Sequence, residues 1–97
     1  MKTCVVHCRK EPYDQYIGRP GRYGNMHYVG YCSRCDVVHT RGEAIQQFKL
    51  DFLTLPNWLS LLRELQDKRL GCWCKPKACH GDVYVELIEE HLVKNGR

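Results

Sequence analysis

The chain has 97 residues, enough for one hydrophobic core but not for two, so we expect a single domain over residues 1–97. Hydrophobic residues make up 43% and charged residues 27%, and these ordinary values exclude a disordered or fibrous protein. The formal net charge of +4 is a mild excess, which suits an anionic ligand but falls short of a dedicated DNA-binding domain.

Targeting and redox signals point to a cytoplasmic protein without a membrane partner. Residues 1–7 contain too short an apolar run for a signal peptide, and no segment approaches the ~20 apolar residues of a membrane span. The seven cysteines are an odd number, and in a reducing compartment thiols are more often buried, metal-bound or reactive than paired. A full disulfide framework is therefore not expected.

The N-terminal part predicts one strand and a long irregular region. Residues 4–8 are β-branched at their centre and precede charged residues, which is typical of a short strand. Cys4 and Cys8 are expected to pack as ordinary side chains. Residues 13–41 are rich in Gly, Tyr and Arg, with extended candidates only at 16–17 and 27–31, so we expect a loop or hairpin of the length that usually carries function.

The C-terminal part predicts three helices and one more strand. Thr40 and Glu43 have the spacing of a capping box, so a helix should follow. The apolar residues at helical spacing that should form its buried face are Ala44, Ile45, Phe48, Phe52 and Leu55. A second helix can start at 56–57, is expected to carry Trp58 to Leu65 and to end in the polar run at 66–69, and is followed by a buried strand over 70–74 and a third helix beginning near 79–82.

This order of elements predicts an α/β protein: a small single-domain α/β sandwich with a short sheet, a long Gly/Tyr/Arg-rich loop or hairpin and about three helices. The turn between the strand at 70–74 and the last helix is where such folds bind ligands. Backbone amides at the helix start, together with Lys75, Lys77 and Gly81, would bind phosphate or carboxylate there. The alternative is that both lysines are solvated surface charges.

The cysteines indicate a second kind of chemistry at the same turn. The C-x-C-x4-C-H residues supply thiolates and an imidazole for a tetrahedral zinc ion, and a C-x2-C pair earlier in the chain could complete the ligand set. The candidate metal ligands are Cys32, Cys35, Cys72, Cys74, Cys79 and His80. Simple burial of the C-x-C thiols and a redox role for the C-x2-C pair are the alternatives. Trp73 is expected to face the core.

A glycine- and arginine-rich segment forms the second candidate site. Its glycines allow a close backbone approach, its guanidinium groups suit phosphate, and a tyrosine could stack on a base. The candidate ligand-binding residues are Gly18, Arg19, Arg22, Tyr23, Gly24 and Asn25. Asn25 would either contact the base edge or fix the loop, and a mobile hairpin without a ligand is the alternative. If the protein is an enzyme, Cys79 is the expected nucleophile, because a helix N-terminus and lysines would lower its pKa, with His80 or Asp82 handling protons.

Taken together, the two segments resemble the phage and bacterial domain family numbered 4326. Its members carry a GR-x3-[WY]-GN segment and a GCWC-x-P-x2-CHGD segment, which appear here at 18–25 and 71–82. Met26 stands where the family usually has proline, and the C-x2-C pair is not part of the family pattern. The resemblance implies a small α/β domain in a phage or bacterial host, and no established activity.

Three function classes follow from these features. The first is a protein that binds a nucleotide-like small molecule and sequesters or processes it. The second is a zinc-stabilised interaction domain that should unfold when the metal is chelated. The third is a nucleic-acid-binding module, whose affinity should fall steeply with salt.

Overall fold

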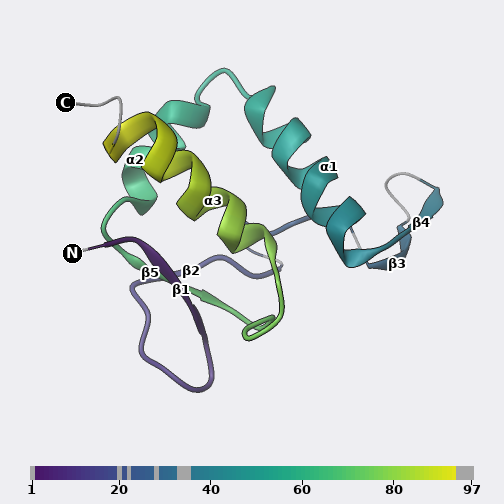
Figure 1. Cartoon of the computed structure of the whole chain (residues 1–97), viewed down its shortest axis with the longest axis horizontal. Helices are drawn as coiled ribbons and strands as arrows, with labels where there is room; N and C mark the ends of the chain where they lie inside the picture. Colours follow the sequence, from purple (N-terminus) through teal and green to yellow (C-terminus); the bar gives the residue numbers. More distant parts are fainter. Residues whose placement is uncertain (1, 20, 22, 28, 33–35, 94–97) are drawn as a thin grey trace.

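Three parallel strands form the main sheet of the computed structural model, which describes residues 2–19, 21, 23–27, 29–32 and 36–93 (Figure 1). Strand β5 (Arg69–Cys72) is central, with β1 (Cys4–His7) on one side and β2 (Gln15–Tyr16) on the other. Because β5 has neighbours on both edges, three of its four residues are buried. Both predicted strands are present, although β1 ends at His7 and β5 ends at Cys72, short of the predicted ends at 8 and 74.

A separate antiparallel hairpin stands beside the beginning of the first helix, away from the main sheet (Figure 1). It consists of β3 (Gly30–Cys32) and β4 (Val37–His39). The sequence predicted a loop or hairpin here, and β3 partly overlaps the extended candidate at 27–31, while β4 was not predicted.

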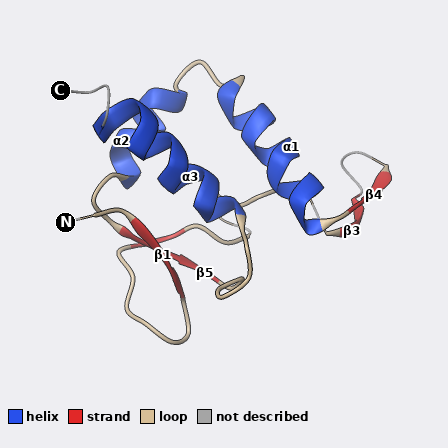
Figure 2. Ribbon diagram, in the orientation of Figure 1, coloured by secondary structure: helices blue, strands red, loops and turns tan. Residues whose placement is uncertain are grey.

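The helices lie on one side of the main sheet and give a two-layer molecule (Figure 2). They are α1 (Arg41–Leu53), α2 (Trp58–Leu65) and α3 (His80–Ile88), and α3 continues into a π-helical turn at Glu89–Val93. The capping box is confirmed: Thr40 Oγ1 accepts from the Glu43 amide at 3.1 Å, and Glu43 Oε1 accepts from the Thr40 amide at 2.7 Å.

The core lies between the sheet and the helices, where α3 packs against α1, α2 and β1. The members of the predicted face of α1 that are buried are Ala44, Phe48 and Phe52; Ile45 is half-buried. Leu55 lies beyond the end of α1 and is 41% exposed, so its prediction was wrong. No helix within the described residues is long and apolar enough to cross a membrane.

The fold class is confirmed as mixed α/β, but two side chains lie elsewhere than expected. Trp73 was predicted to face the core and is 53% exposed, because β5 ends at Cys72 and the chain turns before Trp73. Its Nε1 donates to Tyr16 Oη at 2.8 Å, and Arg9 lies over its ring. Cys4 was expected to pack and is exposed, since it begins the edge strand β1.

Candidate functional site

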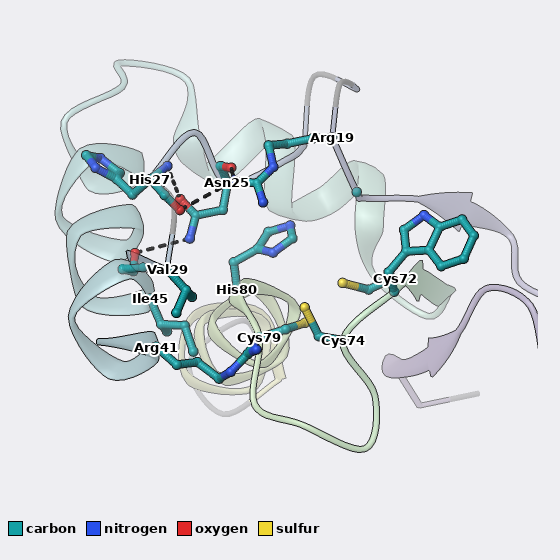
Figure 3. A pocket seen from close by; sticks show the side chains of 13 residues that line it. Arg19, Asn25, His27, Val29, Arg41, Ile45, Cys72, Cys74, Cys79 and His80 are labelled. Atoms are coloured by element: carbon teal, nitrogen blue, oxygen red, sulfur yellow. Dashed lines mark hydrogen bonds between the residues drawn. The ribbon is translucent and has the colours of Figure 1, made fainter. Parts of the chain in front are cut away.

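A cavity of about 430 Å³ opens where the loop after β2, the start of α1, the end of β5 and the start of α3 meet (Figure 3). Its volume lies within the range of small-molecule sites. The polar and sulfur-containing residues that line it are Arg19, Asn25, His27, Arg41, Cys72, Cys74, Cys79 and His80. The two predicted segments, more than forty positions apart in the sequence, therefore meet at one cavity.

Cys72 carries the most acidic thiol of this cavity. It is the last residue of β5, and the Cys79 thiol donates a hydrogen bond to its sulfur. This hydrogen bond is the main reason why the pKa of Cys72 is lowered to about 5. Burial of Cys72 opposes the shift, whereas the Cys74 amide and the charge of His80 add to it. Cys72 is therefore a thiolate at neutral pH, the form of cysteine that attacks electrophiles and binds metals.

Cys79 does not have the lowered pKa that the sequence predicted. Its hydrogen bond to Cys72 and its burial both raise the pKa of the Cys79 thiol. Cys79 is the N-cap of α3, and its sulfur accepts a hydrogen bond from the Gly81 amide at 3.2 Å. This contact lowers the pKa of Cys79 by less than the other two effects raise it. The expectation that Cys79 is activated by the helix start is wrong, because the neighbouring Cys72 holds the negative charge instead.

The predicted anion site at the start of α3 is occupied by the chain's own groups. Asp82 Oδ2 accepts from the Cys79 amide at 3.1 Å, completing a capping box, and Asp82 Oδ1 pairs with Lys75 at 3.4 Å. Lys77 is exposed and does not line the cavity. Gly81 is buried, and a Cβ there would lie 2.8 Å from Ile17 Cδ1, so its role is close packing.

His80 lies at the centre of the cavity wall (Figure 3). Its Nε2 lies 2.7 Å from the Ile17 carbonyl oxygen, so Nε2 is the protonated nitrogen and Nδ1 remains as an acceptor. Burial lowers the pKa of His80, although this hydrogen bond and the Cys72 charge oppose the shift. A neutral imidazole with Nδ1 as acceptor can take a proton or bind a metal.

The loop after β2 brings Gly18, Arg19 and Asn25 to the cavity. Arg19 Nη1 donates to the Asn25 carbonyl oxygen at 2.8 Å. Asn25 Nδ2 donates to the Ala44 carbonyl oxygen at 3.1 Å, and Asn25 Oδ1 accepts from the His27 amide at 2.8 Å. Both ends of the Asn25 amide are therefore engaged in fixing the loop, the second of the two roles predicted for it.

Two other predicted residues of this loop, Tyr23 and Gly24, do not line the cavity. Tyr23 is 4% exposed and donates from its hydroxyl to Glu64 at 2.6 Å, so the prediction that its ring stacks on a base was wrong. A Cβ at Gly24 would lie 3.1 Å from the backbone of Arg19, which makes Gly24 a packing position. Arg22 lies outside the described residues.

Arg41 and Trp73 were not predicted to be site residues, yet both line the cavity. Arg41 is the first residue of α1; its Nη1 donates to the Ala78 carbonyl oxygen at 3.2 Å, and its guanidinium also bonds the Cys74 sulfur. The sequence signal was available for Arg41, because it directly follows the capping threonine of a predicted helix. For Trp73 no local signal distinguishes an exposed ring from a buried one.

Among the residues that the structure describes, two buried groups of side chains could hold a metal ion, with the ligand atoms in each group within 4.8 Å of one another. One consists of Cys72, Cys79 and His80, which were all predicted metal ligands. The other places Cys32 beside two histidines that were not predicted, His27 and His39. The structure thus separates Cys32 from the thiols of the β5–α3 turn, and the predicted ligand Cys35 lies outside the described residues.

The matches to known proteins extend over most of the chain. A family model described as "Domain of unknown function (DUF4326)" matches residues 5–90. An Enterobacteria phage T4 protein described as "Uncharacterized 12.4 kDa protein in nrdA-td intergenic region" is 36% identical over 88 residues, which cover 87% of this chain and 75% of the relative. No solved structure matches the chain.

Proposed function

This chain belongs to the DUF4326 family, and we propose that it binds a nucleotide-derived anionic ligand in the cavity between the loop after β2 and the β5–α3 turn. The observation that carries the proposal is the convergence of two guanidinium groups, Arg19 and Arg41, on a cavity of about 430 Å³. Planar guanidinium forks suit phosphate oxygens, and the volume suits a nucleotide.

The remaining lining groups fit the other parts of such a ligand. The exposed Trp73 ring offers an aromatic surface for a base. Ala44 and Ile45 supply apolar contacts from α1. In a phage-infected bacterial cell, a binder of this size would sequester a host nucleotide, and the cytoplasm is the compartment in which it would meet that ligand.

The Cys72 thiolate supports processing of the ligand as well as binding. In a covalent step, the sulfur electron pair would form a bond to an electrophilic carbon of the ligand, and the bond to the departing group would break with its electron pair leaving on that group. His80 Nδ1 and the Cys79 thiol are the proton-handling groups beside Cys72. Cys72 therefore replaces Cys79 as the proposed nucleophile.

Replacing Arg41 with glutamine should weaken binding of a nucleoside diphosphate about 10- to 100-fold, because one charge-assisted hydrogen-bond donor is lost from the cavity. Isothermal titration calorimetry with ADP, and with inorganic phosphate for comparison, measures this. Lys77→Gln is the matched control, since it removes an exposed cation from the neighbouring turn without changing the cavity wall.

Three results would contradict this proposal. A larger loss of ADP affinity in Lys77→Gln than in Arg41→Gln would indicate that the anion binds at the start of α3 and not in the cavity. If the wild-type protein binds no nucleotide, the proposal that the ligand is derived from a nucleotide is wrong. Tight binding of an oligonucleotide with a steep fall in affinity as salt rises would favour a nucleic-acid-binding module instead.

A metal centre is the second candidate, favoured by the buried group of Cys72, Cys79 and His80. Thiolate and imidazole ligands suit zinc, and the hydrogen bond from His80 to the Ile17 carbonyl oxygen is the kind of contact that orients a metal-binding histidine. Under this candidate, native mass spectrometry should find one zinc fewer in Cys72→Ser than in the wild type. Equal zinc content in the two proteins would eliminate it.

A further inference from the structure

We propose that His27, Cys32 and His39 form a zinc site that fastens the β3–β4 hairpin to α1. The site shares His27 with the wall of the cavity described above, but Cys32 and His39 do not line that cavity, and in Figure 3 the His27 ring points away from the cysteines of the β5–α3 turn. Its three ligand atoms lie within 4.8 Å of one another, and all three residues are buried.

The hairpin places two of these side chains on one face. In its antiparallel register Cys32 lies opposite Val37, so His39, two residues beyond Val37, is on the same side as Cys32. Cys32 is completely buried and His39 is 7% exposed, whereas Tyr31 and Val38 on the other face are 61% and 73% exposed. The inward face thus carries a thiol and an imidazole where a hairpin normally presents apolar side chains.

The distance between His27 and Cys32 fits a shared ion. Cys32 Sγ lies 3.7 Å from His27 Nδ1. A zinc ion with ligand bonds of about 2.3 Å to sulfur and about 2.0–2.1 Å to nitrogen, at the tetrahedral angle, holds those two atoms about 3.6 Å apart. The measured separation is therefore that of two ligands along one edge of a zinc tetrahedron.

His39 supplies an independent observation. Its Nε2 is buried and has no hydrogen-bond partner among the residues that the structure describes. Such an orphaned buried nitrogen is costly unless a further group binds it. Because the same imidazole belongs to the group with His27 and Cys32, a metal ion would satisfy it.

His27 already has the outer contact that metal-binding histidines use. Its Nε2 lies 2.5 Å from Asp51 Oδ2 on α1, while its Nδ1 faces Cys32. A carboxylate on the second nitrogen fixes the ring and its tautomer and increases its basicity as a ligand. Since isolated two-stranded hairpins are at best marginally stable, an ion bridging His27, Cys32 and His39 gives this one the anchor it needs.

Co²⁺ serves as the probe for this site, because tetrahedral Co²⁺ with a thiolate ligand absorbs visible light. The Cys72→Ser substitution disrupts the other group of possible metal ligands, which consists of Cys72, Cys79 and His80. Metal-free protein with this substitution should bind one Co²⁺ and develop the thiolate charge-transfer band. His39→Gln in this background should weaken Co²⁺ binding at least about 100-fold, and Asp51→Asn about 10- to 100-fold. The matched control is His91→Gln, because His91 belongs to neither group of possible ligands.

An unchanged Co²⁺ affinity in His39→Gln, or absence of the band from the Cys72→Ser protein, would overturn the site. Circular dichroism shows whether His39→Gln is folded. If it is not, proton NMR of the Co²⁺-loaded Cys72→Ser protein decides the matter. Paramagnetically shifted imidazole signals from two histidines support the site, and signals from fewer than two overturn it.

Discussion

Replacing Cys79 with alanine should raise the pKa of Cys72 from about 5 to above neutral pH, because the hydrogen bond from the Cys79 thiol is the largest factor that stabilises the thiolate. Without that donor, burial of Cys72 favours the neutral thiol. Cys72 would change from mostly ionised at neutral pH to mostly protonated, and its reactivity with electrophiles would fall in proportion.

The measurement is an ultraviolet titration of thiolate absorbance in the presence of a chelator, with the Cys72→Ser form of each protein subtracted. Cys79→Ser should give an intermediate pKa, since its hydroxyl can still donate and serine is a good N-cap. Cys4→Ala removes an exposed thiol that does not belong to the group of Cys72, Cys79 and His80. It should leave unchanged the acidic step, which is the rise in thiolate absorbance near pH 5. An acidic step that persists in Cys79→Ala would show that another group stabilises the thiolate.

Replacing Tyr84 with alanine should lower the free energy of unfolding by about 3–5 kcal/mol, a large share of the ~5–15 kcal/mol typical of a domain. Tyr84 is 2% exposed and packs edge-on against the rings of Phe48 and Phe52, at centroid distances of 5.2 and 5.4 Å. Its hydroxyl donates to the Tyr23 carbonyl oxygen at 2.8 Å, so it also ties the glycine- and arginine-rich loop to α3.

Urea unfolding of three variants separates these contributions. Tyr84→Phe keeps the ring and should cost about 1 kcal/mol, the usual value of one hydrogen bond. Leu50→Ala is the control, because Leu50 is 50% exposed on α1 and its truncation should change stability by less than about 0.5 kcal/mol. Equal losses for Tyr84→Phe and Tyr84→Ala would mean that the hydroxyl, rather than ring burial, accounts for the stability.

Local sequence signals predicted most of the secondary structure correctly. The Thr40–Glu43 capping box, the β-branched start of the chain and the apolar spacing of residues 58–65 each depend on neighbours within a few positions. The hairpin strand β4 was missed because it has three residues, and its formation depends on pairing with β3. Short strands leave too little periodicity for a pattern to identify them.

The candidate site was predicted in part, for a related reason. Both segments that form the cavity were identified from residue types, since arginine, glycine and cysteine are recognisable wherever they occur. The sequence could not assign the thiolate to Cys72 rather than Cys79, because the assignment depends on a hydrogen bond between two thiols that the β5–α3 turn brings together. The sequence also could not show that the capping box of α3 already binds the backbone amides at the start of that helix, where an anion was predicted to bind.

By itself, then, the sequence determined the α/β class, the helix starts and the chemical character of the two segments, because these depend on local backbone preferences and on side-chain type. Only the tertiary structure decided which side chains share a site. It placed Trp73 at the surface, brought Arg41 to the cavity and set His27 beside His39 of the hairpin. Each of these outcomes depends on packing between elements, which no local pattern of residues specifies.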